Sequence, residues 1–310
     1  MSTSGSRTGS GFSPEPIPIG ETVAPPFARL PEPEALFAAR AARFRALAPG
    51  HGIEPYLTFL GALASIQASI QEDLPISEWP TAETIERALD FGMPPLNRAD
   101  FVPDRAFTEI LDRLLTAAGE VSMPDQARKA LARVAAMDGE ARAALARNLL
   151  ADSVPAEQFA EHGFVAAALQ VHFARLAAAL DAGELQPVGD GACPACGSPP
   201  VSSLVVGWEG AHGTRFCACG LCGTLWNHVR VKCTLCGSTE GIAYHAIENH
   251  PTTVKAETCD SCRCYLKILL QHIDPELDPV ADDIATLALD LLVREAGWRR
   301  GAVNPFLLGY

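Results

Sequence analysis

The chain has 310 residues, of which 48% are hydrophobic and 20% charged, a balance typical of globular proteins rather than disordered or fibrous ones. No apolar run reaches the ~20 residues of a membrane-spanning helix, so membrane insertion is not expected. The net charge of −13 argues against a nucleic-acid partner, because phosphate binding depends on clustered lysine and arginine.

The N-terminal segment from Met1 to Pro26 is rich in serine, glycine and proline and lacks the short apolar core of a signal peptide. We interpret residues 1–30 as a flexible tail and expect a cytoplasmic protein. All ten cysteines fall between Cys193 and Cys264. Because cytosolic thiols are kept reduced, clustered cysteines there more often bind a metal than form disulfides.

From residue 31 to residue 186 the pattern is helical almost throughout. Two apolar stripes repeat at the spacing of a helix face. The stripes consist of Phe107, Ile110, Leu111, Leu114, Leu115 and Ala118, and of Val165, Leu169, Phe173, Leu176 and Leu180. The alanine-rich segment 126–150 between them favours helix by propensity. The sequence therefore predicts an all-helical domain over 31–186, with six or seven helices packed as an antiparallel bundle.

After Gly189 the composition changes abruptly to cysteine, glycine, valine, threonine and aromatic residues. Short alternating runs predict strands at 201–206, 214–217, 224–231, 242–248, 252–258 and 265–270. A single helix is expected from Pro279 to Ala296, with Asp278 as its N-cap and Gly297 as its stop. The predicted class is α+β: the helical domain, two small metal ribbons over 187–230 and 231–272, and a C-terminal helix and tail over 273–310.

Eight cysteines form four Cys-x-x-Cys pairs, and the gap between the first and second pairs is as long as that between the third and fourth. Adding 40 to each position in the first two pairs gives the last two, so the chain holds an internal repeat. Such pairs are typical of the four-cysteine sites of rubredoxins and zinc ribbons. The predicted metal ligands are Cys193, Cys196, Cys219 and Cys222 at site 1, and Cys233, Cys236, Cys259 and Cys262 at site 2. A cross-braced arrangement, in which the first and third pairs share an ion, is the alternative.

A Cys-x-x-Cys turn lets two thiolates converge on one ion, and a glycine after the second cysteine permits the tight backbone. Gly197, Gly223 and Gly237 follow three of the pairs. Arg263 follows the fourth, which is therefore expected to turn differently. Each ribbon is too small for a stabilising core, so metal binding must supply much of the folding free energy, ~10–16 kcal/mol for structural zinc in small peptides.

Four protein ligands close a tetrahedral site and leave no open position to activate water, so we expect no enzyme activity.

Cys217 and Cys264 fall outside the repeat, either as free thiols or with an alternative ligand or redox role. The spacing does not distinguish iron from zinc, because both ions accept four thiolates. Between Pro187 and Tyr310 there are 13 acidic and 9 basic residues, which disfavours a zinc-ribbon module that binds nucleic acid.

The segment from Cys193 to Tyr310 resembles the FdhE family of formate dehydrogenase accessory proteins. The resemblance rests on CPACGSPPVSS at 193–203, HVRVKCTLCGST at 228–239, KAETCDSC at 255–262, ADDIATLALDLL at 281–292 and NPFLLG at 304–309. It implies a cytoplasmic maturation factor, or chaperone, that binds the catalytic subunit of respiratory formate dehydrogenase before twin-arginine export. It also implies rubredoxin-like sites, and so favours two mononuclear iron ions over zinc.

Four further residues are candidates for partner contact or for a supporting shell around the metals. Lys255 and Glu257 lie beside the fourth pair, and exposed charges on an alternating strand explain them equally well. Asp282 and Asp283 lie on a polar helix face, where capping and solvation are the simpler explanation. A rubredoxin-like electron carrier remains an alternative function. The oligomeric state, a homo-oligomer included, the client-binding surface, and a structural or redox role of the metals stay open.

Overall fold

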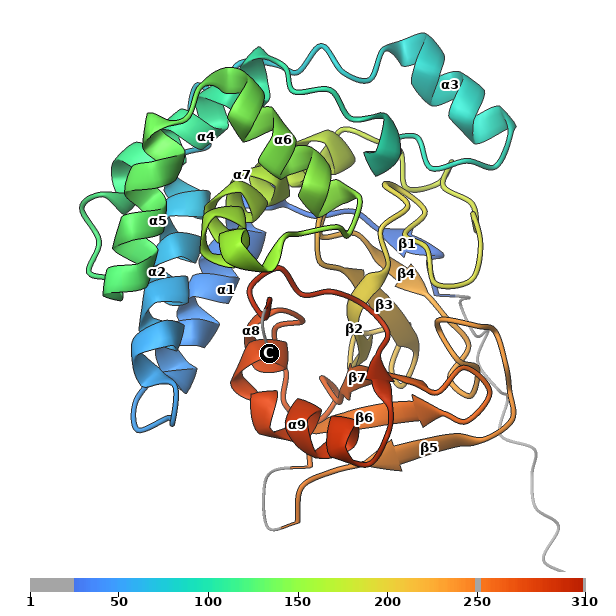
Figure 1. The fold of residues 1–310 in the computed structure, drawn as a ribbon. Coiled ribbons are helices and arrows are strands. Elements are labelled where there is room, and N and C mark those ends of the chain that lie inside the picture. The colour runs from blue at the N-terminus through green and yellow to red at the C-terminus, as the bar shows by residue number, and fades with distance from the viewer. Residues whose placement is uncertain (1–24, 249–251, 309–310) are drawn as a thin grey trace, which may run out of the picture.

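The computed structural model describes residues 25–248 and 252–308. It is an α+β fold in which a helical region precedes a sheet that carries the cysteines, and two short helices follow (Figure 1). The helices of the first region are α1 (Pro33–Leu47), α2 (Glu54–Ser69), α3 (Ala82–Asp90), α4 (Arg105–Ala118), α5 (Asp125–Ala136), α6 (Gly139–Leu150) and α7 (Phe159–Ala178). No helix in the described ranges is both long and apolar enough to cross a bilayer.

Helix α4 forms as the periodicity predicts. Every residue of its stripe is buried, and the Asp104 carboxylate accepts a hydrogen bond from Phe107 N at its first turn. Helix α7 departs from the one-sided pattern, because 14 of its 20 residues are buried. Its alanines let α4, α5 and α6 pack closely around it. Helix α7 is therefore the central helix of the region, and not one of several equivalent helices of the antiparallel bundle that the sequence predicts.

His172 is enclosed in this helical core. It lies on α7, is 2% exposed and contacts the rings of Phe101, Phe107 and Phe173, and its Nε2 has no hydrogen-bond partner among the described atoms. Burial lowers its pKa to about 4. The unfolded chain binds a proton at this residue near pH 6.5. The folded chain does not until about pH 4, so the stability that neutral His172 contributes is lost as the pH falls through this window.

We therefore expect His172→Leu to reduce the acid sensitivity of folding. Between about pH 8 and about pH 5 the variant should lose about 2 kcal/mol less free energy of unfolding than the wild type. Urea unfolding at both pH values, on samples of matched metal content, measures this difference. Equal losses in the two proteins would show that His172 does not stay neutral in the folded state.

The strands form one mixed sheet in the order β1-β4-β3-β2-β7-β6-β5, with β8 pairing β7. They are β1 (Ala28–Arg29), β2 (Pro200–Val205), β3 (Arg215–Cys219), β4 (Leu225–Asn227), β5 (Ile242–His245), β6 (Val254–Cys259), β7 (Cys264–Leu269) and β8 (Arg299–Arg300). Each copy of the sequence repeat supplies three antiparallel strands, β2 to β4 and β5 to β7. Strands β2 and β7 pair in parallel and join the repeats, which makes one continuous sheet of the two ribbons.

The flexible tail predicted for residues 1–30 includes residues that belong to the sheet. Residues 1–24 lie outside the described residues, but Ala28 and Arg29 form β1 and pair with Trp226 and Leu225 of β4. Phe27 O also accepts a hydrogen bond from Asn227 N. The segment before α1 therefore covers the edge of the first ribbon.

The single helix expected over 279–296 is two helices, α8 (Ala281–Ala285) and α9 (Leu287–Glu295), which break at Thr286. The cause is Lys267 on β7, whose buried ammonium donates to the carbonyls of Asp283 and Thr286. In an uninterrupted helix the carbonyl of Asp283 would accept from Leu287 N, one turn later. The carbonyl of Thr286 accepts from Leu289 N as well as from Lys267. The helix begins at Ala281 rather than at Pro279, and its N-cap is Val280 rather than Asp278. The Asp278 carboxylate still accepts from Val280 N and Ala281 N just before and at the start of the helix. Gly297, with φ +94°, follows the end.

Buried ion pairs fix the C-terminal segment between α1 and the sheet, a position visible in Figure 1 where red meets blue. Asp278 pairs with Arg40, and Asp282 forms a bidentate pair with Arg43. Asp283 is fully buried beside Lys267 and Arg300. Burial alone would raise the pKa of Asp283, but the two cations outweigh it and hold that pKa below its ordinary value.

Candidate metal centres

The eight paired cysteines converge into two groups of four, one per repeat. In each group the four sulfur atoms lie within 4.8 Å of one another. The first group consists of Cys193, Cys196, Cys219 and Cys222, and the second of Cys233, Cys236, Cys259 and Cys262. The sulfurs therefore meet in the order first pair with second and third with fourth, and not in the cross-braced order.

The sulfur spacing fits a tetrahedral ion. The Sγ atoms of Cys193 and Cys222 are 3.6 Å apart, and those of Cys236 and Cys259 are 3.7 Å apart. A tetrahedron with metal–sulfur bonds of about 2.3 Å has edges of about 3.8 Å, whereas a disulfide bond is about 2.05 Å long. All ten cysteines are unbridged. Each group thus offers the donor set and the spacing that a zinc or iron ion requires, with no ligand position left for water.

One backbone turn is used four times, so the expectation of a different fourth turn is wrong. In each pair the residue after the second cysteine donates its N–H to the carbonyl of the first cysteine, as Gly197 does to Cys193 and Arg263 does to Cys259. The three glycines have φ between +73° and +77°, and Arg263 has φ +56°. A left-handed arginine costs roughly 1 kcal/mol. Its guanidinium lies 4.8 Å from the centre of the Trp298 ring, an attraction that offsets this cost.

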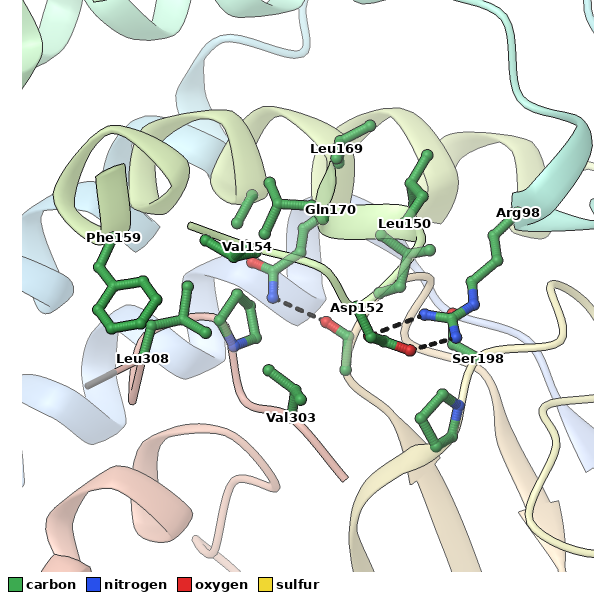
Figure 2. A pocket seen from close by; sticks show the side chains of 16 residues that line it. Arg98, Leu150, Asp152, Val154, Phe159, Leu169, Gln170, Ser198, Val303 and Leu308 are labelled. Carbon is green, nitrogen blue, oxygen red and sulfur yellow. Dashed lines mark hydrogen bonds and ion pairs between the residues drawn. The ribbon is translucent and has the colours of Figure 1, made fainter. Parts of the chain in front are cut away.

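Site 1 belongs to the main hydrophobic core. Its four cysteines are between 0% and 3% exposed and pack in the same cluster as the helices. The loop before α4 covers the first turn, because Leu96 N donates to Ala195 O and Arg98 N donates to Cys196 O. Gln170 of α7 covers the second turn and donates to Gly220 O, as Figure 2 shows.

A small cavity of about 230 Å³ lies beside this covered site (Figure 2). Side chains from α6, α7, the site 1 turns and the C-terminal tail line it, and the Arg98–Asp152 ion pair stands at one side. Its volume is below the ~300–1,000 Å³ usual for ligand pockets. We therefore regard it as a packing gap where the helical region meets site 1.

Site 2 lies at the surface. Cys233 and Cys259 are buried, but Cys262 is half-buried and Cys236 is exposed. Its first turn is contacted on one side by Gly301, where an added β-carbon would lie 1.9 Å from Leu235 Cδ1 and would displace that side chain. The residues around its second turn, Asp260 and Arg263, are exposed and pair with each other.

A buried ion pair connects the two repeats between the metal sites. Arg215 of β3 forms a bidentate pair with Glu257 of β6, with two N···O distances of 2.8 Å and side chains 0% and 3% exposed. Arg215 also donates to Ser203 Oγ and to Oγ1 of Thr234, the residue after the first ligand of site 2. The sequence alone gives Arg215 no special status, because nothing in its strand pattern indicates a partner in the other repeat.

Of the four residues that were candidates for partner contact, three are buried and one is half-buried. Glu257, Asp282 and Asp283 are buried in ion pairs within the chain, which leaves them no free surface in this structure. Lys255 is half-buried on β6, where its backbone pairs with Ile268. The two aspartates join the C-terminal segment to the helices and the sheet, and their charges are balanced by the half-buried Arg43 and Arg300 and the buried Lys267.

The two cysteines outside the repeat differ from each other. Cys217 on β3 is fully buried, and burial raises the pKa of its thiol to about 12, so it remains a neutral thiol. Cys264 is half-buried and begins β7, where it pairs across the ladder with Cys259. Neither sulfur joins a group of four.

Models of one protein family match the chain along almost its whole length. Residues 25–190 match the N-terminal part of the FdhE model, residues 192–230 its central domain, and residues 231–307 its C-terminal domain. The chain belongs to the FdhE family. An FdhE homolog from Rhizobium meliloti (strain 1021) is 44% identical over 303 residues, which cover 97% of this chain and 99% of that protein. One from Edwardsiella ictaluri (strain 93-146) is 38% identical over 285 residues, 90% of each chain.

A solved FdhE structure shares the fold. The crystal structure of the FdhE protein from Pseudomonas aeruginosa matches with a TM-score of 0.82 at 32% sequence identity. The match covers 92% of this chain and 99% of that chain. The family resemblance of the cysteine half thus extends to the helical half, which offers no sharp motif by itself.

Proposed function

We propose that this FdhE-family chain is a cytoplasmic accessory protein in the maturation of formate dehydrogenase. It binds the catalytic subunit of the respiratory enzyme before that subunit is exported by the twin-arginine route. The observation that carries the proposal is family membership over almost the whole chain, together with the two closed four-sulfur groups. The family name supplies the link to formate dehydrogenase.

The metal chemistry supports a binding protein rather than an enzyme. When bound, an ion with four thiolate ligands holds its two turns together and, if it is iron, can also exchange one electron. Each site is built to close around its ion, so no water is activated there. We propose iron as the ion in both sites, in keeping with the rubredoxin-like character of the family, and we propose that the chain has no catalytic activity of its own.

Gene deletion and complementation test this function. In a host that makes respiratory formate dehydrogenase, deletion should abolish most of that activity, and the wild-type gene should restore it. Cys233→Ser should restore much less, with the client's transcript unchanged, whereas Cys264→Ser, which changes a cysteine outside both groups, should restore it fully. An affinity-tagged chain should also retain the catalytic subunit. Full activity in the deletion strain would defeat the proposal.

A further inference from the structure

The two metal groups are equal in sequence spacing but unequal in surroundings, and this inequality indicates different chemistry. The repeat relates every ligand of site 1 to one of site 2 by the same offset along the chain. Cys196 and Cys236 are such a pair, yet Cys196 is 0% exposed and Cys236 is exposed. Ligand exposure therefore does not follow from the Cys-x-x-Cys turn itself, which is the same in both repeats.

The helical region makes the difference. At site 1 its residues donate hydrogen bonds to the carbonyls of Ala195, Cys196 and Gly220. The equivalent positions in the second repeat are Leu235, Cys236 and Asp260. Throughout the described residues, no group of α1 to α7 or of their loops donates to these three carbonyls.

The residues between the two cysteines of a turn also differ in exposure between site 1 and site 2. Leu221, in the second turn of site 1, is half-buried and lines the cavity next to α7. Its counterpart at site 2 is Ser261, which is exposed. The Oγ atoms of Ser261 and Ser238 are 2.9 Å apart and share a hydrogen bond. Site 1 is thus enclosed by apolar packing, whereas the outer side of site 2 carries hydroxyl groups in contact with water.

We propose that site 1 is a permanent structural centre and that site 2 is an exchange centre, at which an incoming thiol- or nitrogen-bearing ligand reaches the ion beside Cys236. In the exchange the incoming sulfur or nitrogen donates a lone pair to the ion while the bond from the ion to Cys236 breaks. When the incoming donor is a thiol, its proton passes to the freed Cys236 thiolate; when it is a nitrogen base, the freed thiolate takes up a proton from solvent. No electron is transferred. At site 1 the same attack first requires the helical region to open, which has a free energy closer to that of global unfolding.

Metal exchange at site 2 is a property of the chain alone and does not depend on the identity of a client. It makes site 2 the place at which metal is loaded, withdrawn or presented to a partner. Metal release therefore tests it directly, and its failure would leave the role in formate dehydrogenase maturation untouched.

The experiment measures metal release from the full-length chain, purified without oxygen and loaded with zinc at both sites, using the chromogenic chelator 4-(2-pyridylazo)resorcinol. Two phases of one equivalent each are expected, with the first faster by about 10-fold or more. Cys236→Ser should remove the fast phase while circular dichroism shows the helical content retained. The matched variant Cys196→Ser should instead lose helical content. Release in a single phase, or equal helix loss in the two variants, would overturn the assignment.

A measurement on the unmodified chain tests the difference between the two sites even if Cys196→Ser does not fold. Limited alkylation with iodoacetamide, followed by peptide mass spectrometry, orders the metal-bound cysteines by reactivity. Cys236 should be alkylated first among the eight, and the four cysteines of site 1 only when the helices unfold. Alkylation of any site 1 cysteine before Cys236 contradicts the proposal.

Discussion

Serine in place of Cys222 is expected to abolish metal binding at site 1 and to unfold the helical region together with the first ribbon. Cys222 is fully buried in the cluster that contains the cores of α1, α2, α4 and α7. Structural zinc contributes ~10–16 kcal/mol to the folding of small metal domains, and a whole domain is stable by only ~5–15 kcal/mol. Losing one of four ligands removes enough of this contribution to exceed the reserve.

Metal content and urea unfolding of the purified variant measure this effect. We expect no more than one metal ion per chain and a large loss of helical signal in Cys222→Ser. Cys264→Ser makes the same chemical change at a half-buried cysteine outside both groups and should keep the wild-type metal content and stability within about 1 kcal/mol. A Cys222→Ser protein with two ions and an unchanged urea midpoint would show that site 1 does not hold the fold together.

The second large effect is expected at the ion pair between the repeats. Glu257→Ala leaves the Arg215 guanidinium fully buried without its carboxylate, since both side chains are at most 3% exposed. Removing one partner of a buried pair costs about 3–5 kcal/mol. The loss should appear as a lower urea midpoint with both metal groups still able to bind, because neither residue is a ligand.

Two comparisons identify the cause of that loss. The double change Arg215→Met with Glu257→Leu should be less destabilised than Glu257→Ala, because it leaves no unpaired buried charge. Asp190→Ala breaks the ion pair with Lys232, in which the lysine side chain is 31% exposed and the aspartate side chain 45%. This change should lower the free energy of unfolding by less than about 1 kcal/mol. If Glu257→Ala costs no more than Asp190→Ala, the buried pair contributes nothing special to the joint between the repeats.

The sequence predicts the metal groups well because their geometry is local. A thiolate pair within one turn and a partner pair one hairpin later leave few ways to fold, and the internal repeat separates the two sets. The helix face of α4 follows for a similar reason, since each stripe residue is fixed by its own helix. The class of the fold, with helices first and cysteine ribbons after, follows from the change in composition at Gly189.

The remaining features depend on contacts between distant segments. The break at Thr286 is caused by Lys267 on another element, and the charge of Asp282 is satisfied by Arg43, 239 positions earlier. The left-handed turn at Arg263 is imposed by the same hydrogen bond that glycine makes easily elsewhere. Repeat spacing gives both metal groups the same status, so the covering of site 1 by the helices was not predictable from it.

The proposed fold stability and function both depend on two ions, each bound by four thiolates. Native mass spectrometry of the chain purified without oxygen, combined with its visible absorption spectrum, tests this most directly. We predict two metal ions per chain, with visible thiolate-to-iron absorption if both are ferric and a colourless protein if both are zinc. A folded chain without metal, whose paired cysteines are joined as disulfides, would contradict it.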